Sequence, residues 1–411
     1  MTTMKSEYGS LEKGGVDTGS RWHSRSHSPS WRRQYHAIPR FLRLFLIAAT
    51  TFILFRVFVR IHGDIRDTTL KSLPTDFGPL ARATGAVLTP PSRAVRRQNT
   101  THIDGRYIYM RELGKGAQGS AALYTDLETG DVVVIKTYQG RGHNPVPDDL
   151  AYEMGRVPET WPAEIEAGLL LGDSFVEGRS VYVPVRDYFL IDFKNKQDPW
   201  VMVSPYISGG TLENLATSLK SRRKAPQELD VQFRPVFDAL LAGLGPLHEA
   251  NYCHNDIKQD NVFVAAEDHW LLGDLGGVRD FWHPWYWTQK IQRENQWTDC
   301  KLNDFRRALK TYMWFLRNAC ADPSLFDQAF YAGVEGWSKL YWDFMREPSE
   351  MAGKWVESRW NIEAEEGGVE VLGATEILVE GSACLQRKVE LELTCTALHY
   401  QLQDWLPFRR C

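Results

Sequence analysis

The chain has 411 residues, of which 43% are hydrophobic and 24% are charged, and its formal net charge is -4. A chain of this length and composition can bury a substantial core in one large domain or two modest ones. The small negative charge argues against a general nucleic-acid binder, which would carry a basic excess. We therefore expect a globular protein whose partners do not include nucleic acid.

Residues 1–39 are rich in Ser, Arg, His and Gly and have no apolar periodicity, so we predict a disordered tail. Residues 40–62 are mostly apolar, with the run Leu44–Phe55 between Arg43 and Arg56. A spanning helix needs about 20 residues, and arginines near its ends can reach the interface. We predict a single membrane-spanning helix, with an interfacial amphipathic helix as the alternative.

Basic residues without acidic ones precede this segment, at Arg21, Arg25, Arg32, Arg33 and Arg40. Basic and acidic residues are mixed after it, so the positive-inside tendency slightly favours a cytoplasmic N-terminus and a translocated C-terminal domain (type II). The glycosylation sequon at Asn99 fits that orientation, although one sequon does not decide it. The localisation that we expect is a single-pass membrane protein.

We interpret residues 63–100 as a linker, residues 101–345 as the main domain and residues 346–411 as a C-terminal extension of unknown role. Within the main domain, short strand-like runs come first and helical patterns follow. This order predicts an α+β fold with a small β-rich part before a larger helical part. The strands are expected at Tyr107–Leu113, Val132–Tyr138, Ser180–Leu190 and Trp200–Tyr206.

Three glycines with GxGxxG spacing, Gly114, Gly116 and Gly119, follow the first of these strands. Glycine lets the backbone approach phosphate oxygens closely, with N–H groups as donors. A second strand follows the glycines instead of a helix, so the pattern indicates a glycine hairpin and not a dinucleotide fingerprint.

Lys136 ends an apolar strand, where its charge needs a partner. The helix expected over Pro162–Leu171 offers Glu164 and Glu166. We predict Glu166 as the partner, because apolar Leu169 and Leu170 follow it three and four positions on. Glu164 would then be a solvated charge of the first turn.

The segment from His254 to Asn261 is dense in ionisable and polar side chains and lies between apolar runs. Such a cluster at a buried edge is costly unless it performs chemistry. Asp274 follows at the end of another short apolar strand, beside a flexible glycine.

Together these motifs resemble the protein-kinase superfamily, with HxDxKxxN at His254–Asn261 and DLG at Asp274–Gly276 in place of DFG. The resemblance implies a bilobal protein-kinase-like fold that uses ATP and Mg²⁺. Gly114–Gly119 would cover the phosphates, and Lys136 would contact them while paired to Glu166. The remaining implied roles are metal binding by Asn261 and Asp274, orientation of the acceptor hydroxyl by Asp256 and contact with the γ-phosphate by Lys258.

Residues 201–212 resemble the hinge of a kinase, with Ser204 as gatekeeper and with Tyr206 and Ile207 near the adenine. Asp304 is similar to the buried aspartate of the central helix of the large lobe. Asn255 replaces the arginine that pairs with an activation-loop phosphate in many kinases, so activation by loop phosphorylation is doubtful.

The segment after Asp274 is short, has no APE motif and is rich in aromatic residues. Glu294 is a weak substitute for the APE glutamate. The aromatic residues indicate either an apolar substrate platform or packing of a truncated loop. The six cysteines form no CxxC pair, so we expect free buried thiols, with bridges as the alternative in an extracytoplasmic domain.

The predicted function is that of a membrane-tethered protein Ser/Thr kinase, whose partners are ATP, a membrane and a protein substrate with a hydroxyl acceptor. Lys258, two residues after Asp256, is similar to Ser/Thr kinases. A small-molecule kinase of related fold is the enzymatic alternative. A pseudokinase scaffold is the other alternative, and the presence of Lys136, Asp256, Asn261 and Asp274 argues against it.

Overall fold

The structure is a computed structural model that describes residues 40–71, 73–84, 96–98, 102–103, 105–116, 119–138, 162–172, 174–176, 178–192, 199–288, 291, 296–348 and 382–394. The predicted tail at 1–39, the sequon at Asn99 and the residue Glu294 lie outside the described residues. The chain divides at Arg60 into two units.

Helix α1 (Arg40–Lys71) contains the predicted apolar segment and continues beyond residue 62. Between Phe41 and Arg60 its side chains are exposed, apart from a half-buried Ala49. The helix is long and apolar enough to cross a membrane, by length and composition alone.

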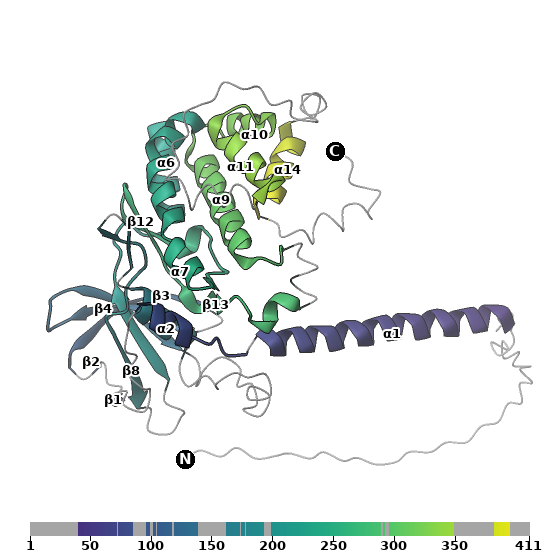
Figure 1. Ribbon diagram of the computed structural model, residues 1–411, viewed down its shortest axis with the longest axis horizontal. Helices are drawn as coiled ribbons and strands as arrows, with labels where there is room; N and C mark the ends of the chain where they lie inside the picture. The colour runs from purple at the N-terminus through teal and green to yellow at the C-terminus, as the bar shows by residue number, and fades with distance from the viewer. Residues whose placement is uncertain are drawn as a thin grey trace, which may run out of the picture. The chain divides into compact units, whose positions relative to one another are not determined.

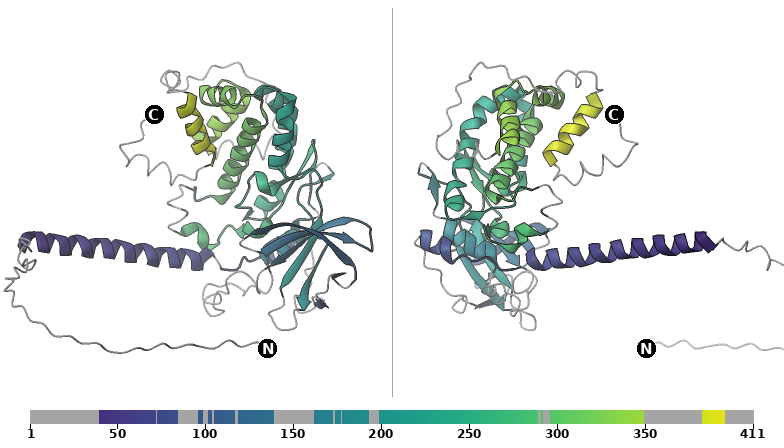
Figure 2. Two further views of the ribbon diagram at one scale, coloured as in Figure 1. Left: turned by 180° about the vertical axis from the view of Figure 1, so that it is seen from behind. Right: turned by 45° about the vertical axis from the view of Figure 1, so that its right-hand side comes forward.

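The second unit is a mixed α and β protein in which a sheet region precedes a helical region (Figures 1 and 2). Its main sheet has seven strands in the order β1-β8-β9-β5-β4-β3-β2, and the pairing of β1 with β8 is the parallel one. The strands are β1 (Arg96–Gln98), β2 (His102–Ile103), β3 (Tyr107–Gly116), β4 (Gly119–Asp126), β5 (Val132–Tyr138), β8 (Asp187–Asp192) and β9 (Trp200–Pro205).

Alternation along β5 decides which side chains face the functional side of the sheet. Val133 and Ile135 are buried in a cluster on one face with Val201 and Val203 of β9. Because successive residues of a strand point to opposite faces, Lys136 and Tyr138 share the face opposite to that of Ile135. Tyr138 packs with Ile165 of helix α4 (Ala163–Leu171), so Lys136 points toward α4.

Residues 73–84 pack into the domain even though the sequence indicated a linker at 63–100. Leu73, Phe77 and Leu80 are buried, and the Phe77 ring stacks on Tyr252 at 5.9 Å between centroids. Helix α2 (Gly78–Thr84) shares its apolar cluster with α4. This part of the expected linker therefore contributes to the core.

The helical region surrounds helix α9 (Cys300–Ala319), most of whose side chains are buried. Around it lie α5 (Leu212–Leu219), α6 (Pro226–Ala242), α7 (Gly245–Glu249), α10 (Pro323–Ala332), α11 (Gly336–Arg346) and α14 (Ser382–Thr394). Helix α14 belongs to the extension predicted at 346–411, and its Val389 and Leu393 are buried in the main cluster. The described part of the extension therefore contributes a packed helix.

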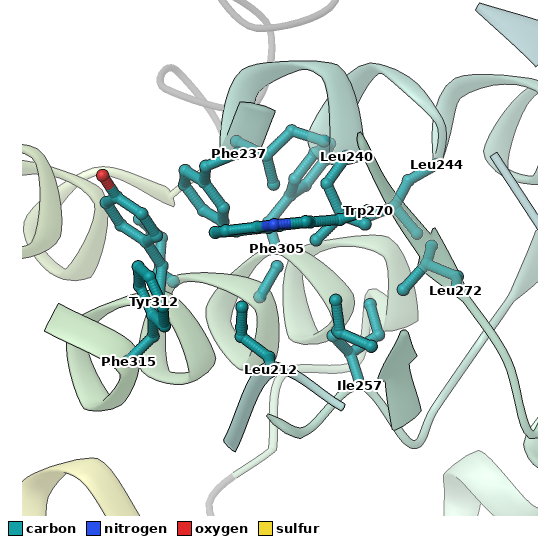
Figure 3. Packing of buried hydrophobic residues seen from close by; sticks show 14 of the residues in the cluster. Leu212, Phe237, Leu240, Leu244, Ile257, Trp270, Leu272, Phe305, Tyr312 and Phe315 are labelled. Carbon is teal, nitrogen blue, oxygen red and sulfur yellow. The ribbon is translucent and has the colours of Figure 1, made fainter. Parts of the chain in front are cut away.

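The centre of the apolar core is Trp270, on β12 (His269–Leu272). Figure 3 shows its indole between Phe237 and Leu240 of α6 on one side and Leu212 and Ile257 on the other. Trp270 also meets Phe315 of α9 edge-on, with ring centroids 5.2 Å apart. Burial of aromatic side chains on this scale dominates the stabilising free energy of a core. Ile257 of the polar loop 254–261 and Val262 directly after the loop belong to this core, which therefore anchors the loop.

Candidate active site

The glycine hairpin joins β3 to β4, and Gly116 pairs with Gly119 at its tip. A Cβ atom on Gly119 would lie 2.0 Å from the carbonyl oxygen of Thr137, and its φ is +156°, so a side chain does not fit. A Cβ on Gly114 or Gly116 would meet no atom within 4 Å. The hairpin therefore needs glycine at one position for packing and has open space at the other two.

Lys136 donates from Nζ to Glu164 Oε2 at 2.5 Å and lies 3.5 Å from Asp274 Oδ1. Burial lowers the pKa of Lys136, but the carboxylates of Glu164 and Asp274 outweigh it and raise the pKa above its ordinary value. The ammonium group is therefore charged at neutral pH. The arrangement holds a cation between two carboxylates that come from different elements.

Glu164, and not the predicted Glu166, is the partner of Lys136. Glu164 lies on the buried face of α4 with Ala167, Gly168 and Leu171, whereas Glu166 is half-buried. Positions three, four and seven residues apart share a helix face, so Leu171 identifies the inward stripe. The prediction used Leu169 and Leu170 instead, and of these Leu169 is half-buried.

Tyr138 is a site residue that the sequence interpretation missed. Its hydroxyl donates to Glu164 Oε2 at 2.7 Å, and burial followed by the Glu164 charge raises its pKa well above the ordinary value. The hydroxyl therefore stays protonated and orients the carboxylate. The signal was present in the sequence, because Tyr138 is two residues after Lys136 and thus on the same face of β5.

The predicted hinge, residues 201–212, begins within β9 and continues past its end at Pro205. Ser204 is buried and lies opposite Val134 of β5, and the Tyr206 N–H donates to the carbonyl of Val132 at 3.2 Å. The carbonyl of Ile207 accepts from Gly210 N, which closes a tight turn before α5. These bonds place Tyr206 and Ile207 immediately beyond the central strands of the sheet.

Asp304 of α9 supports the polar loop from beneath. It is fully buried and accepts hydrogen bonds from His254 N at 2.6 Å, Asn255 N at 2.8 Å and His248 Nε2 at 3.1 Å. Burial opposes ionisation, but the His248 hydrogen bond and nearby positive charges lower the pKa of Asp304 below its ordinary value. An ionised Asp304 thus fixes the backbone just before Asp256.

His254 is held in one tautomer. Its Nδ1 accepts from the N–H of Asp256 at 3.3 Å, so Nε2 carries the proton and donates to the carbonyl of Gly273 at 3.2 Å. Burial lowers the pKa of His254, which keeps the ring neutral. The imidazole therefore ties the loop before Asp256 to the strand that ends before Asp274.

Two of the predicted site residues, Lys258 and Asn261, contact the carboxylate of Asp256. Lys258 Nζ lies 2.8 Å from Asp256 Oδ2, and Asn261 Nδ2 donates to the same oxygen at 3.0 Å and to the Asp256 carbonyl at 2.7 Å. The Asp256 side chain remains 43% exposed, so a substrate has access to it. Because the Asn261 nitrogen is engaged, its amide oxygen is the atom that can ligate a cation.

Asp274 adopts a left-handed backbone conformation with φ of 53°, which is uncommon for a residue other than glycine. Three residues after Asp274, Gly277 lets the backbone lie close to the carbonyl of His254, because a Cβ atom on Gly277 would lie 2.7 Å from that oxygen. The Gly273 N–H donates to the carbonyl of Asn261 at 2.8 Å. Val262 and Leu272 pair with each other, so the structure places both predicted metal ligands, Asn261 and Asp274, beside the same end of a strand pair.

Asn255 also has a left-handed backbone, with φ of 66°, which asparagine tolerates better than most residues. Its Nδ2 lies within hydrogen-bond distance of the Cys253 and Gly277 carbonyls, each at 3.1 Å, and of the Tyr286 hydroxyl at 2.8 Å. Neutral hydrogen bonds therefore join the polar loop to the segment after Asp274. No phosphate is needed for this connection.

Two cysteines form a disulfide, contrary to the expectation of free thiols. Cys253, at the end of β10 (Tyr252–Cys253), is bonded to Cys300 at the start of α9, with Cα atoms 6.0 Å apart. Cys320 is a buried free thiol. No local pattern indicates this pair, because the fold brings together two residues that are 47 positions apart.

The aromatic residues after Asp274 divide into two groups. Phe281, Trp285 and Tyr286 pack against the disulfide, as the packing interpretation expected. Trp282 and Trp287 are exposed, at 67% and 56% of their surface. The segment contains β13 (Arg279–Asp280), which pairs with β10. It is therefore held against the polar loop by a strand pair and the disulfide.

No protein-family model matches the chain. The chain is 32% identical over 93 residues to a probable serine/threonine-protein kinase mkcD of Dictyostelium discoideum, which covers 23% of the chain and 13% of the relative. It is 26% identical over 186 residues to serine/threonine-protein kinase 1 of Arabidopsis thaliana, a match that covers 45% of the chain and 18% of the relative. It is 23% identical over 213 residues to serine/threonine-protein kinase RIM15 of Saccharomyces cerevisiae, a match that covers 52% of the chain and 10% of the relative. The chain is a divergent relative of the protein-kinase superfamily.

The chain spans less than a fifth of the length of these three kinases. The similarity therefore concerns one domain of each relative. Relative to the usual kinase pattern, the chain differs at Asn255 and at Leu275, and the segment after Asp274 lacks an APE sequence.

Proposed function

We propose that the chain is an ATP- and Mg²⁺-dependent phosphotransferase with a bilobal kinase fold that phosphorylates a Ser or Thr hydroxyl of a protein. The observation that carries this proposal is the pairing of Lys136 with Glu164 opposite Asp274. A lysine held between two carboxylates is placed to bind the phosphates of a nucleotide. The adjacent cluster of Asp256, Lys258 and Asn261 would then receive the acceptor.

The residues present fit ATP and Mg²⁺. The open space above Gly114 and Gly116 leaves room for phosphate oxygens at the backbone of the hairpin. Asp274 and the amide oxygen of Asn261 are the oxygen donors that Mg²⁺ prefers, and bound Mg²⁺ would neutralise charge on the phosphates. Because the Tyr206 N–H is bonded to Val132, Ile207 would supply the next backbone donor for an adenine ring.

The transfer step assigns a role to each side chain. Asp256 accepts the proton of the acceptor hydroxyl as that oxygen forms a bond to the γ-phosphorus. The bond between the γ-phosphorus and the β–γ bridging oxygen breaks, and ADP leaves with that oxygen. Lys258, which lies 2.8 Å from Asp256, would offset the charge of the transferring group. Lys136 would hold the remaining phosphates.

A small hydroxylated molecule is the second candidate acceptor. The segment after Asp274 is short and held down by the β10–β13 pair and the disulfide, so it offers less surface to an extended peptide. This candidate and a scaffold without activity are separate outcomes of the same experiment.

The test is Mg²⁺-dependent transfer from labelled ATP by the full-length protein, with protein acceptors and small hydroxylated acceptors in parallel. Asp256→Asn should lower the transfer at least about a hundredfold while nucleotide binding remains. Asp268→Asn, an exposed aspartate paired with Arg179, is the matched control and should behave as the wild type. Transfer to small acceptors only would reject the protein-kinase proposal, and nucleotide binding without any transfer would favour the scaffold.

We also propose that α1 tethers the protein to a membrane with the kinase domain on the extracytoplasmic side. The Cys253–Cys300 disulfide supports this orientation, because disulfides persist in oxidising compartments and are rare in the cytosol. The arginines before the helix and the Asn99 sequon support the same orientation.

A further inference from the structure

Residues 73–80, which we call the bridging segment, contact three parts of the fold that surround the candidate active site. The segment begins two residues after the end of α1. Its contacts are with the chain after Asp274, with Tyr252 two residues before the polar loop, and with α4, which carries Glu164. Each contact joins the bridging segment to an element that positions the proposed phosphate-binding groups.

Hydrogen bonds join the bridging segment to the chain after Asp274 at two separate points. Thr75 Oγ1 donates to the carbonyl of Val278 at 3.1 Å. His283 Nε2 lies 2.9 Å from the carbonyl of Leu73, and because a carbonyl oxygen only accepts, this nitrogen carries the proton. Val278 and His283 are fully buried, which strengthens hydrogen bonds at these points. The bridging segment therefore fixes the backbone that follows Asp274.

Tyr252 of β10 is the second contact. Its ring stacks on Phe77, with the ring planes 2° apart and the centroids 5.9 Å apart. Its hydroxyl donates to the carbonyl of Asp76, and the Leu80 N–H donates to the hydroxyl oxygen at 3.4 Å. Burial raises the pKa of Tyr252, so the hydroxyl stays protonated and remains a donor. The bridging segment is thus held against the strand that leads into His254.

Helix α4 is the third contact, and its position depends on packing. It has nine residues, and its N-cap residue is Pro162, whose side chain cannot accept a hydrogen bond. A helix this short takes most of its stability from burial of its apolar face. Helix α2 lies against α4, and the two share one buried cluster that includes Phe77, Leu80, Ala167, Leu170 and Leu171. The bridging segment therefore supports the helix that carries Glu164.

Helix α4 also lies against the turn η4 (Leu275–Gly277), which directly follows Asp274. Glu164 Oε2 and Asp274 Oδ1 are the two oxygens on either side of the Lys136 ammonium group. A close-packed interior transmits displacements. Movement of the bridging segment would therefore move Glu164 relative to Lys136 and Asp274.

We propose that the bridging segment positions Glu164 against Lys136 and Asp274 for phosphate transfer. The residues that directly follow the predicted membrane helix would then support catalysis and not only tether the domain. This inference rests on the proposed function and adds a positioning segment to it, one that acts through α4 and does not touch the reacting atoms. Transfer is sensitive to such support, because a misplacement of about 1 Å can lower a rate about a hundredfold.

The experiment labels the amines of the full-length protein with acetic anhydride and follows Lys136 by mass spectrometry. Only the neutral amine reacts, and the two carboxylates keep Lys136 charged, so the wild type should label slowly. Phe77→Ala should raise the labelling rate of Lys136 about fivefold, because its partners move away, and lower kcat/KM about tenfold. Phe77→Leu keeps most of the apolar volume and should stay within about twofold of the wild type in both measurements.

Phe326→Ala is the matched control. Phe326 is also a fully buried phenylalanine, stacked on Trp337 at 4.6 Å between centroids, but it lies on α10. The control should lose stability as Phe77→Ala does, yet keep the wild-type labelling rate of Lys136 and the wild-type kcat/KM. All variants are compared well below the midpoints of their thermal melts. Equal labelling of Lys136 in Phe77→Ala and Phe326→Ala would overturn the inference.

A second measurement uses the wild type and does not depend on a variant being folded. Coupling between two sites is reciprocal, so saturating ATP and Mg²⁺ should slow hydrogen exchange of the Leu80 and Ala81 N–H groups about threefold. These groups donate to Tyr252 Oη and to the carbonyl of Phe77. Unchanged exchange with nucleotide bound would overturn the inference. Faster labelling of Lys136 in Phe77→Ala, with no phosphate transfer by the wild type, would instead overturn the proposed kinase function and leave the support of Glu164 standing.

Discussion

At the scale of single residues, the difference between Glu164 and Glu166 is one of direction around the axis of α4. Two residues along a helix rotate a side chain by about 200°, so only one of them can face Lys136. The leucines of the sequence are compatible with either of two faces of α4 turned toward the core. The structure buries Glu164 on the same face as Ala167 and Leu171, which decides between them. Sequence reasoning found the helix and the need for a carboxylate but not its position.

Glu164→Gln is predicted to lower kcat/KM about a hundredfold, because Lys136 loses the charge that positions it. Glu166→Gln is the matched control, two residues away on the same helix, and should stay within about twofold of wild type. Steady-state phosphate transfer with the two variants in parallel tests this. Equal losses in both variants would contradict the assignment of Glu164.

Asn255 supplies a second prediction at this scale. Replacement of Asn255 by Ala removes the two hydrogen bonds that its side-chain NH2 group can donate and puts alanine into a left-handed conformation, so the free energy of unfolding should fall by about 2–4 kcal/mol. Asn251→Gly is the control, because Asn251 has a similar φ of 65° but lies on the surface. Urea unfolding measures both.

The same network predicts that phosphatase treatment leaves the activity of the wild type unchanged. Asn255 is joined to Tyr286 by a neutral hydrogen bond, so the loop needs no phosphate to be held. Loss of activity after phosphatase treatment would show that a phosphate elsewhere does this work.

At the scale of elements, two of the four predicted strands agree closely with the structure. The run Val132–Tyr138 coincides with β5, and Trp200–Tyr206 differs from β9 by one residue. The prediction Ser180–Leu190 is wrong in its first half, because β8 begins only at Asp187. A short apolar run bounded by turns indicates a buried strand locally, so the sequence contains what is needed for β5 and β9. The Cys253–Cys300 bond and the docking of Phe77 on Tyr252 depend on contacts distant in sequence, and no local pattern indicates them.

Helix α2 and the residues before it pack against α4 and Tyr252 of β10, so they should affect stability. Phe77→Ala is predicted to lower the free energy of unfolding by about 3–5 kcal/mol, the usual effect of removing a buried aromatic ring. Val231→Ala, at a position with 73% exposure, should change it by less than about 0.5 kcal/mol. A thermal melt of each variant distinguishes a packed segment from a passive linker.

At the scale of the whole molecule, the proposed orientation predicts both a glycan and an oxidised cysteine pair. Protein made in eukaryotic cells should lose apparent mass on glycosidase treatment, and Asn99→Gln should remove that shift. Cys253 and Cys300 should resist alkylation until a reductant is added. An unshifted band together with immediate alkylation of both cysteines would place the kinase domain in the cytosol.

Helix α14 reaches the surroundings of Asp256: its Leu393 lines the same cavity of about 380 Å³ as Asp256, and the carbonyl of Glu392 accepts from Lys310 at 2.5 Å. It lies far along the chain from the glycine hairpin and from Lys136. Under the proposed function, mutations in α14 would change the surroundings of the acceptor while the groups proposed to bind ATP stay as they are. An evolving lineage would then change its targets without risking its chemistry, and a C-terminal tag or truncation in the laboratory would make the same intervention.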